Sequence, residues 1–278
     1  MDKRLLTIQD VSCVGQCSLT VALPVISACG IETGILPSSV LSNHTAGFSG
    51  WTFHDLTEDM PKILDRWLTE KVTFDAFYTG YVSKAQIPYI LDIMEKTARP
   101  GALRIVDPVM ADNGKLYAGF DDDFPQEMKK LCKGADVIMP NLTEAAFLLG
   151  QPYVAEGYDK AFIEKMARDL AALGAKNVVV TGVSFEKDKL GVAVYSAKDD
   201  KVEYYFNEKQ AVSSHGTGDL YASVVTGALL RGKTLLEAAS LGADVVVEAI
   251  KITNGDKDHW YGVKFEKALP YLIKRLEK

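Results

Sequence analysis

The residues with the clearest potential for chemistry form a short motif, Gly216-Thr217-Gly218-Asp219, that precedes an apolar stretch. Glycines let backbone N–H groups approach an anion closely, because no Cβ stands in the way. A helix beginning here would point its unpaired N–H groups and the positive end of its dipole at that anion. Asp219 in the first turn could then accept a proton from a hydroxyl that attacks a phosphate. An aspartate is also favoured in a first helical turn for structural reasons alone, so a plain helix start remains the alternative.

Oxygen-bearing side chains of the kind that Mg²⁺ prefers follow two other predicted strands. Asp107 and Asp112 come after the first of these strands, and Asn141 and Glu144 come after the second. On a helix start, a spacing of three residues puts Asn141 and Glu144 on one face, where they can hold a hydrated Mg²⁺. The alternative interpretation is an ordinary helix N-cap with its capping box.

A third motif imitates a phosphate-binding loop. Residues 227–234 fit the P-loop pattern letter for letter. A P-loop follows a strand, however, whereas residues 221–230 have helical apolar spacing. We predict instead two helices and a turn, with Gly232 at the end of the first helix and a Thr234–Glu237 capping box opening the second.

Short β-type runs alternate with longer helical patterns along the chain. This alternation favours a mostly parallel, doubly wound sheet with helices on both faces, which is a three-layer α/β fold, and we expect a single domain over 1–278. The predicted strands are 5–8, 31–36, 74–78, 103–106, 137–139 and 178–181, with a hairpin of 191–195 and 202–206. The predicted helices are 18–29, 60–69, 87–98, 124–132 and 161–173, and the chain is mostly helical from Asp219 onward. Polar motifs stand at predicted strand ends, where open parallel sheets bind ligands: Asp10, 80–81, 107–108, 140–141 and 181–182.

Composition limits the partners. The chain has 278 residues, 47% of them hydrophobic, and a net charge of −6. This charge argues against nucleic acid as a main partner, and no basic amphipathic stripe or long apolar span points to a membrane. The apolar run 17–31 resembles a secretion signal, but Pro24 interrupts it, so a buried strand and helix are favoured. The four cysteines lack zinc-ligand spacing, and such sparse use favours the cytoplasm.

Taken together, these motifs resemble those of the ribokinase-like superfamily and, within it, of the pyridoxal (vitamin B6) kinases. The resemblance spans nearly the whole chain, and the Ser-Asn-His-Thr sequence ending at Thr45 is its most specific mark. The motifs that carry it are Asp10, Leu41-Ser-Asn-His-Thr45, Gly80-Tyr81, Asp107-Pro-Val-Met110, Pro140-Asn-Leu-Thr-Glu144 and Gly216-Thr-Gly-Asp219.

The resemblance implies ATP-dependent phosphorylation of the 5′-hydroxymethyl group of a B6 vitamer. Asp219 would be the general base, and Gly216, Thr217 and Gly218 would surround the migrating phosphoryl group. The resemblance assigns the nucleotide to Asp107, Asn141, Glu144 and Thr181. It assigns Mg²⁺ to Asp112 and Glu144. It assigns the vitamer to Asp10, His44, Thr45 and Tyr81. It further implies a homodimer and a response to a monovalent cation such as K⁺.

Asp10 departs from the family pattern, because many pyridoxal kinases have a serine there. A carboxylate at this position could pair with the ring nitrogen, or with the aminomethyl group of pyridoxamine. We therefore expect a preference for pyridoxamine, with a merely structural role for Asp10 as the alternative.

Two rival functions remain open. A hydroxymethylpyrimidine kinase of thiamin synthesis shares the scaffold, but such relatives usually carry a cysteine where this chain has Asp219, and they lack Ser-Asn-His-Thr. A non-catalytic B6-binding protein on the same fold would need no general base.

Overall fold

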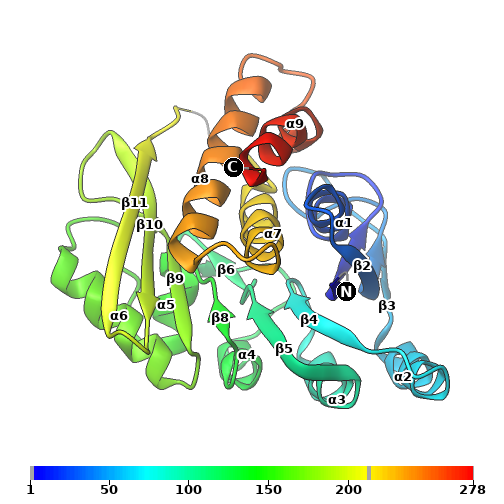
Figure 1. Cartoon of the computed structure of the whole chain (residues 1–278). Coiled ribbons are helices and arrows are strands. Elements are labelled where there is room, and N and C mark those ends of the chain that lie inside the picture. Colours follow the sequence, from blue (N-terminus) through cyan, green and yellow to red (C-terminus); the bar gives the residue numbers. More distant parts are fainter. Residues whose placement is uncertain (1–2, 212–213, 278) are drawn as a thin grey trace. The chain divides into compact units, whose positions relative to one another are not determined.

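The computed structural model describes residues 3–211 and 214–277. The chain divides into two compact units (Figure 1). Unit 1 comprises Met1–Ala102 and Gln210–Lys278, and unit 2 comprises Leu103–Lys209. The expectation of a single domain over 1–278 stays a prediction.

The strands of unit 1 stand in the order β4-β1-β2-β3. Their bounds are β1 (Arg4–Ser12), β2 (Glu32–Leu41), β3 (Phe53–Asp55) and β4 (Phe74–Thr79). Strand β1 runs parallel to both β2 and β4, and its residues 5–10 are all buried, as expected of an interior parallel strand. Strand β3 pairs antiparallel with β2 and is exposed at all three residues, as a short edge strand can be.

Helices cover both faces of the sheet of unit 1 (Figure 1). On one face, α1 (Leu19–Ala28) packs against β1 and β2 and against α7 (Thr217–Leu230). Next to α7 lie α8 (Leu235–Thr253) and α9 (Phe265–Leu276). The opposite face carries α2 (Met60–Thr69) and α3 (Ile87–Thr97), each preceded by a short 3-10 turn, η1 (Thr57–Asp59) and η2 (Lys84–Gln86).

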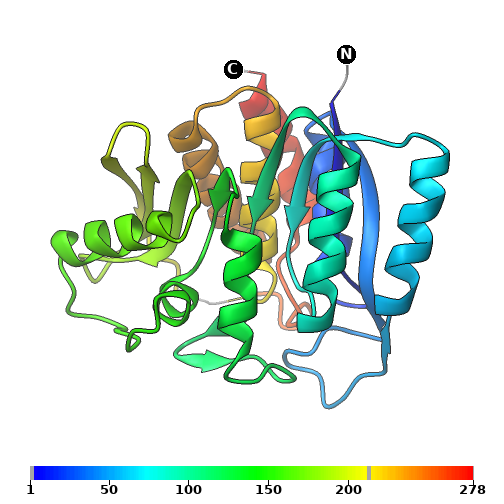
Figure 2. The same ribbon diagram turned by 90° about the horizontal axis from the view of Figure 1, so that it is seen from below.

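The strands of unit 2 follow the order β5-β8-β9-β10-β11, where β5 (Ala98–Val106) contributes its last four residues. The other strands are β8 (Val137–Ile138), β9 (Asn177–Val183), β10 (Lys189–Ser196) and β11 (Lys201–Glu208), and β6 (Ala111–Asp112) and β7 (Lys115–Leu116) form a separate small ladder. Strands β5, β8 and β9 are parallel, whereas β10 and β11 form an antiparallel hairpin. In Figure 2, α4 (Phe124–Cys132), α5 (Leu142–Leu149) and α6 (Lys160–Ala172) cover one face of these strands.

The predicted α/β class, with mostly parallel strands and flanking helices, is confirmed. The interpretation of residues 227–234 as two helices and a turn is also confirmed. Helix α7 ends at Leu230, Gly232 has a φ of +88°, and Thr234 caps α8 in a capping box with Glu237. No helix among the described residues is long and apolar enough to cross a membrane.

Two expectations about elements need correction, and two small elements were not predicted. The first strand does not end at Asp10, because β1 keeps its pairing with β2 as far as Ser12. The helix predicted to reach residue 98 stops at Thr97, since β5 begins at Ala98. The edge strand β3 and the β6–β7 ladder were not predicted, because strands of two or three residues are too short to show an alternating pattern.

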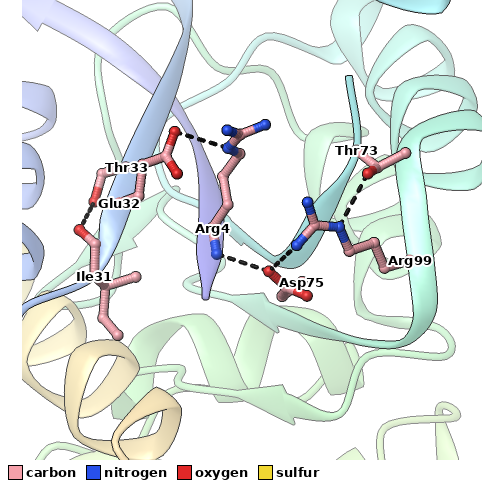
Figure 3. Close-up of polar contacts among 7 residues, drawn as sticks. All are labelled: Arg4, Ile31, Glu32, Thr33, Thr73, Asp75 and Arg99. Atoms are coloured by element: carbon pink, nitrogen blue, oxygen red, sulfur yellow. Dashed lines mark hydrogen bonds and ion pairs between the residues drawn. The ribbon is translucent and has the colours of Figure 1, made fainter. Parts of the chain in front are cut away.

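The amino ends of the strands of unit 1 are joined by a polar network around Asp75 (Figure 3). Its carboxylate accepts the Arg4 backbone N–H at 2.7 Å and Nη1 of Arg99 at 2.8 Å. Arg99 also bonds Thr73, and Nε of Arg4 pairs with Glu32 at 2.8 Å. Partial burial alone would raise the pKa of Asp75, but these hydrogen bonds outweigh it and lower the pKa. The network therefore holds the amino ends of these strands together, at the edge of the sheet opposite to their carboxyl ends.

Replacing Thr234 by alanine tests the assignment of residues 227–234. We expect Thr234→Ala to lower the free energy of unfolding by about 1 kcal/mol, because the N-cap bond to Glu237 is lost. The neighbouring change Lys233→Ala serves as the control, and it should alter stability by less than about 0.5 kcal/mol. Denaturant titration measures both values. Loss of ATP binding in Lys233→Ala would restore the P-loop interpretation.

Candidate active site

Asp10 lies where the pairing of β1 with β2 slips by one residue. Gln9 pairs with Pro37 and Val11 with Val40, so Asp10 alone stands opposite both Ser38 and Ser39. Such bulges are common beside active sites, because they re-aim a side chain. The Asp10 side chain is buried, at 5% exposure, and Ser12 Oγ donates a hydrogen bond to its Oδ2 at 2.9 Å.

The glycine-rich motif forms the start of α7, as predicted. Gly216 is the N-cap residue with a φ of +77°, and a Cβ built on it would lie 1.5 Å from the carbonyl oxygen of Gln16. Only glycine fits there. Gly218, in contrast, is exposed, and a Cβ built on it would meet nothing within 4 Å. This helix N-terminus therefore has open space beside backbone N–H groups that lack helical partners.

Asp219 sits in the first turn of α7 and is partly exposed. The backbone N–H of Ser18 favours the charged form of the Asp219 carboxylate. Loss of hydration outweighs this effect, and together with the nearby charge of Asp10 it raises the pKa of Asp219 to about 7. A carboxylate with this pKa can accept a proton near neutral pH.

His44 is buried and neutral. The backbone N–H of Ala46 donates to its Nδ1 at 3.0 Å, which places the ring proton on Nε2, 3.0 Å from the carbonyl oxygen of Tyr261. Burial lowers the pKa of His44, so it brings no positive charge to the neighbouring Asp10. Thr45, next in the chain, is exposed.

Aromatic rings surround His44 within unit 1. The rings of Phe48 and His215 have centroids 5.1 and 5.6 Å from that of His44, and Phe48 packs on Trp260 at 4.7 Å. The loop that carries Ser-Asn-His-Thr is thus held by aromatic contacts close to the start of α7.

Tyr81 follows β4 and is half-buried. Its carbonyl oxygen accepts a hydrogen bond from Ser38 Oγ at 2.9 Å. Burial raises the pKa of the Tyr81 phenol, and the charges of Asp10 and Asp55 add to this effect. The charge of Asp10 therefore acts on two other predicted site residues, Tyr81 and Asp219.

In unit 2, Asn141 and Glu144 form the capping box of α5, which confirms the structural interpretation of this pair. Asn141 Oδ1 accepts the backbone N–H groups of Thr143 and Glu144, and Glu144 Oε2 accepts the N–H of Asn141 at 2.9 Å. The pair also holds the loop that follows β5. Glu144 Oε1 accepts the N–H of Met110 at 3.1 Å, and Asn141 Nδ2 donates to the carbonyl oxygen of Ala111 at 2.8 Å.

Glu144 is 3% exposed, and this burial raises its pKa to about 8. Since both of its oxygens already accept backbone N–H groups, a metal ion would meet Glu144 more readily through a water molecule. Mg²⁺ keeps several waters, so such a donor fits it. Within 3–211 and 214–277, no three or more His, Cys, Asp or Glu side chains gather as a metal cluster.

The other predicted residues of unit 2 lie beside this capping box. Thr181 forms a bridge with Asn141, and its N–H donates to the carbonyl oxygen of Pro140 at 2.9 Å. Asp107 is buried at the end of β5, and Asp112 is exposed in β6 with Asn113 bonded to its carboxylate. The structure thus gathers Asp107, Asp112, Asn141, Glu144 and Thr181 around one helix start.

Sequence reasoning missed one residue of unit 1, Ser18, which lowers the pKa of Asp10 through its hydroxyl and that of Asp219 through its N–H. The sequence placed it only at the beginning of a helix. A serine before an apolar run signals a helix N-cap, and nothing in that signal indicates a second partner.

Comparison with known proteins gives consistent matches. The model of the phosphomethylpyrimidine kinase family matches residues 26–262. A pyridoxal kinase from Actinobacillus succinogenes is 30% identical over 251 residues, which are 81% of this chain and 80% of that protein.

Solved structures agree with these matches. A Bacteroides thetaiotaomicron protein, in a crystal form with pyridoxal, is 37% identical with a TM-score of 0.92, covering 98% of this chain and 96% of that one. Pyridoxal kinase from Lactobacillus plantarum is 33% identical with a TM-score of 0.89, covering 98% and 97%. The chain therefore belongs to the phosphomethylpyrimidine kinase family, in its pyridoxal kinase group with the ribokinase-like fold.

Proposed function

We propose that this chain transfers the γ-phosphoryl group of ATP to the 5′-hydroxymethyl group of a B6 vitamer. The observation that carries the proposal is Asp219, a carboxylate with a pKa of about 7 in the first turn of a helix that opens with Gly216. A base beside the N–H groups of a helix N-terminus, which lack partners within the helix, suits a hydroxyl that attacks a phosphate. The similarity to pyridoxal kinases supports the vitamer as acceptor.

Asp219 takes the proton of the vitamer hydroxyl as the new O–P bond forms. The bond between the γ-phosphorus and the β–γ bridging oxygen breaks at the same time, and ADP leaves. The backbone N–H groups of residues 216–218 stabilise the negative charge on the migrating phosphoryl group, because its loose transition state spreads charge over the equatorial oxygens. In this proposal, the vitamer that accepts the phosphoryl group contacts Asp10, His44, Thr45 and Tyr81.

The nucleotide side is assigned to unit 2. Asp107, Asn141 and Thr181 would contact ATP. Asp112 and Glu144 would hold hydrated Mg²⁺, since both oxygens of Glu144 already accept backbone N–H groups. When bound, Mg²⁺ neutralises charge on the phosphates. A monovalent cation such as K⁺, a homodimer and a cytoplasmic location complete the proposal. The free state of Cys13, Cys17, Cys29 and Cys132 supports a reducing compartment.

A hydroxymethylpyrimidine kinase is the second candidate, which the name of the matching family model favours. Asp219 and the Ser-Asn-His-Thr sequence favour the vitamer kinase. A B6-binding protein without activity is the third candidate, and it would have no use for a base whose pKa lies near neutrality.

A coupled ADP-release screen tests the proposal. We expect ADP release with pyridoxal, pyridoxamine and pyridoxine, and little with the thiamin pyrimidine or simple sugars. Release with the pyrimidine alone would establish the second candidate. Vitamer binding without any ADP release would establish the third.

Replacing Asp219 tests the base. We expect Asp219→Ala to lose at least about 100-fold in kcat, since a positioned base contributes about 10²–10⁴. ATP affinity, measured by calorimetry, should be retained. In the unchanged protein, kcat/KM should fall tenfold per pH unit below about pH 7, where Asp219 takes up a proton. An alanine variant with near-normal turnover would remove Asp219 from the mechanism.

The charge of Asp10 tests the vitamer preference. Pyridoxamine carries an ammonium group that pyridoxal and pyridoxine lack, and the buried Asp10 can pair with it. We expect kcat/KM for pyridoxamine, divided by that for pyridoxine, to fall at least about tenfold in Asp10→Ser. Equal ratios in the two proteins would show that Asp10 does not select the acceptor.

A further inference from the structure

A hydrogen bond between Ser38 and Tyr81 joins two segments of unit 1 that lie on either side of β1. Ser38 belongs to β2 and Tyr81 follows β4, and β1 stands between these two strands in the sheet. Ser38 Oγ donates to the carbonyl oxygen of Tyr81 at 2.9 Å. Ser38 is 1% exposed, so its hydroxyl is shielded from water. The bond connects the segment after β4 to the slip in strand pairing opposite Asp10.

The side chain of Gln86 links the same two segments. Its Nε2 donates to the carbonyl oxygen of Ser38 at 2.7 Å, and its Oε1 accepts the backbone N–H of Ser83 at 2.9 Å. A carbonyl can only accept and an N–H can only donate, so the orientation of the amide is fixed. Gln86 lies in η2 and is 1% exposed. Both ends of one buried amide are therefore used to hold backbone groups of the two segments.

Gly80 permits the segment after β4 to approach β1 closely. Its N–H donates to the carbonyl oxygen of Ile8 at 3.0 Å. A Cβ built on Gly80 would lie 2.7 Å from Oε1 of Gln9, which is fully buried. A larger residue would have to displace either this segment or the Gln9 amide. The backbone at Tyr81 is thus fixed by Gly80 on one side and by the bond of Ser83 on the other.

A buried amide costs free energy unless hydrogen bonds replace its contacts with water. The bonds of Gln86 to Ser38 and Ser83 meet this requirement, whereas an apolar side chain of similar length would not need them. A buried polar network whose members are bonded specifies one arrangement of the backbone around it. Tyr81 itself is half-buried, so it keeps surface that a ligand can contact. The network therefore fixes the place of a residue that a ligand can still reach.

We propose that Ser38 and Gln86 are positioning residues that hold Tyr81 in place for the vitamer ring, an inference that rests on the proposed contact of Tyr81 with the vitamer. Ser38 acts directly on the Tyr81 carbonyl, and Gln86 acts through Ser38 and Ser83. Phosphoryl transfer to the 5′-hydroxymethyl group leaves the pyridine ring unchanged, so Tyr81 binds substrate and transition state equally. A displaced Tyr81 therefore raises KM for the vitamer and leaves kcat unchanged.

Steady-state kinetics with pyridoxine test this inference. Gln86→Met keeps the length of the side chain and removes the amide, while the Ser38 carbonyl still accepts the N–H of Leu56. We expect KM for pyridoxine to rise about tenfold, with kcat and KM for ATP within about twofold of the wild-type values. Ser38→Ala removes only the bond to Tyr81, and it should raise KM about threefold. This milder variant provides the same test if Gln86→Met does not fold.

Thr97→Val is the matched control. Thr97 Oγ1 is buried and donates to the carbonyl oxygen of Ile93 at 2.6 Å, at the end of α3 and next to the amino end of β5. The change likewise removes a buried hydrogen bond from unit 1, so the melting temperature should fall while KM for pyridoxine stays constant. If KM rises in Thr97→Val as much as in Ser38→Ala, the effect is a general loss of stability and the inference is wrong.

A double-mutant cycle shows whether Ser38 acts through Tyr81. Tyr81→Ala removes the ring but keeps the carbonyl group that Ser38 bonds. We expect Ser38→Ala to raise KM for pyridoxine when the Tyr81 ring is present and to leave KM unchanged when the ring is absent. An equal rise in both backgrounds would mean that Ser38 acts on the vitamer by another route, which overturns the inference.

The outcomes separate this inference from the proposed function. A protein that phosphorylates pyridoxine with an unchanged KM in Gln86→Met and Ser38→Ala overturns the inference and leaves the vitamer kinase intact. A wild-type protein that phosphorylates no vitamer overturns the proposed function, and the cycle is then read from the dissociation constant of pyridoxine, measured by calorimetry. A constant that follows the same pattern establishes the positioning role, whereas an unchanged constant or an absence of binding overturns it.

Discussion

In each unit, a carboxylate beside backbone N–H groups is the feature on which the candidate site residues of that unit depend. In unit 2, the N–H groups of Asn141 and Met110 bind Glu144, and this fixes the loop after β5 to the start of α5. In unit 1, the N–H of Ser18 favours the charged form of Asp219. Neutral donors hold a carboxylate in place without cancelling its charge, so the group stays available to a proton or a cation. A lysine or arginine partner would have held the same groups but made them inert.

Most of the fold followed from the sequence, because its buried strands and amphipathic helices are long enough to show their periodicity. The same was true of local chemistry. The capping boxes at Asn141 and Thr234 are determined by residues three apart, and both were confirmed. The start of α7 at Gly216 was likewise predictable, since a glycine before an apolar helical pattern signals a boundary.

What could not be predicted depends on pairing between distant segments. The one-residue slip opposite Asp10 requires the register of β1 against β2, which no single segment contains. The effect of Ser18 on the pKa values of Asp10 and Asp219 requires α1, β1 and α7 to meet, and the type of residue 18 does not reveal its positive φ of +51°. The raised pKa values of Glu144 and Asp219 likewise come from burial by other elements. Local motifs were therefore enough to find the candidate site residues, whereas the pKa values of these residues could not be predicted from such motifs.

The polar network around Asp75 indicates which parts of this enzyme can be changed in protein engineering. It secures β1 and β4 at their amino ends, away from the loops that would receive an acceptor (Figure 3). The loops at the carboxyl ends of these strands can accordingly be replaced, by insertions or by segments from relatives, while the hydrogen bonds of Asp75 at the amino ends stay in place.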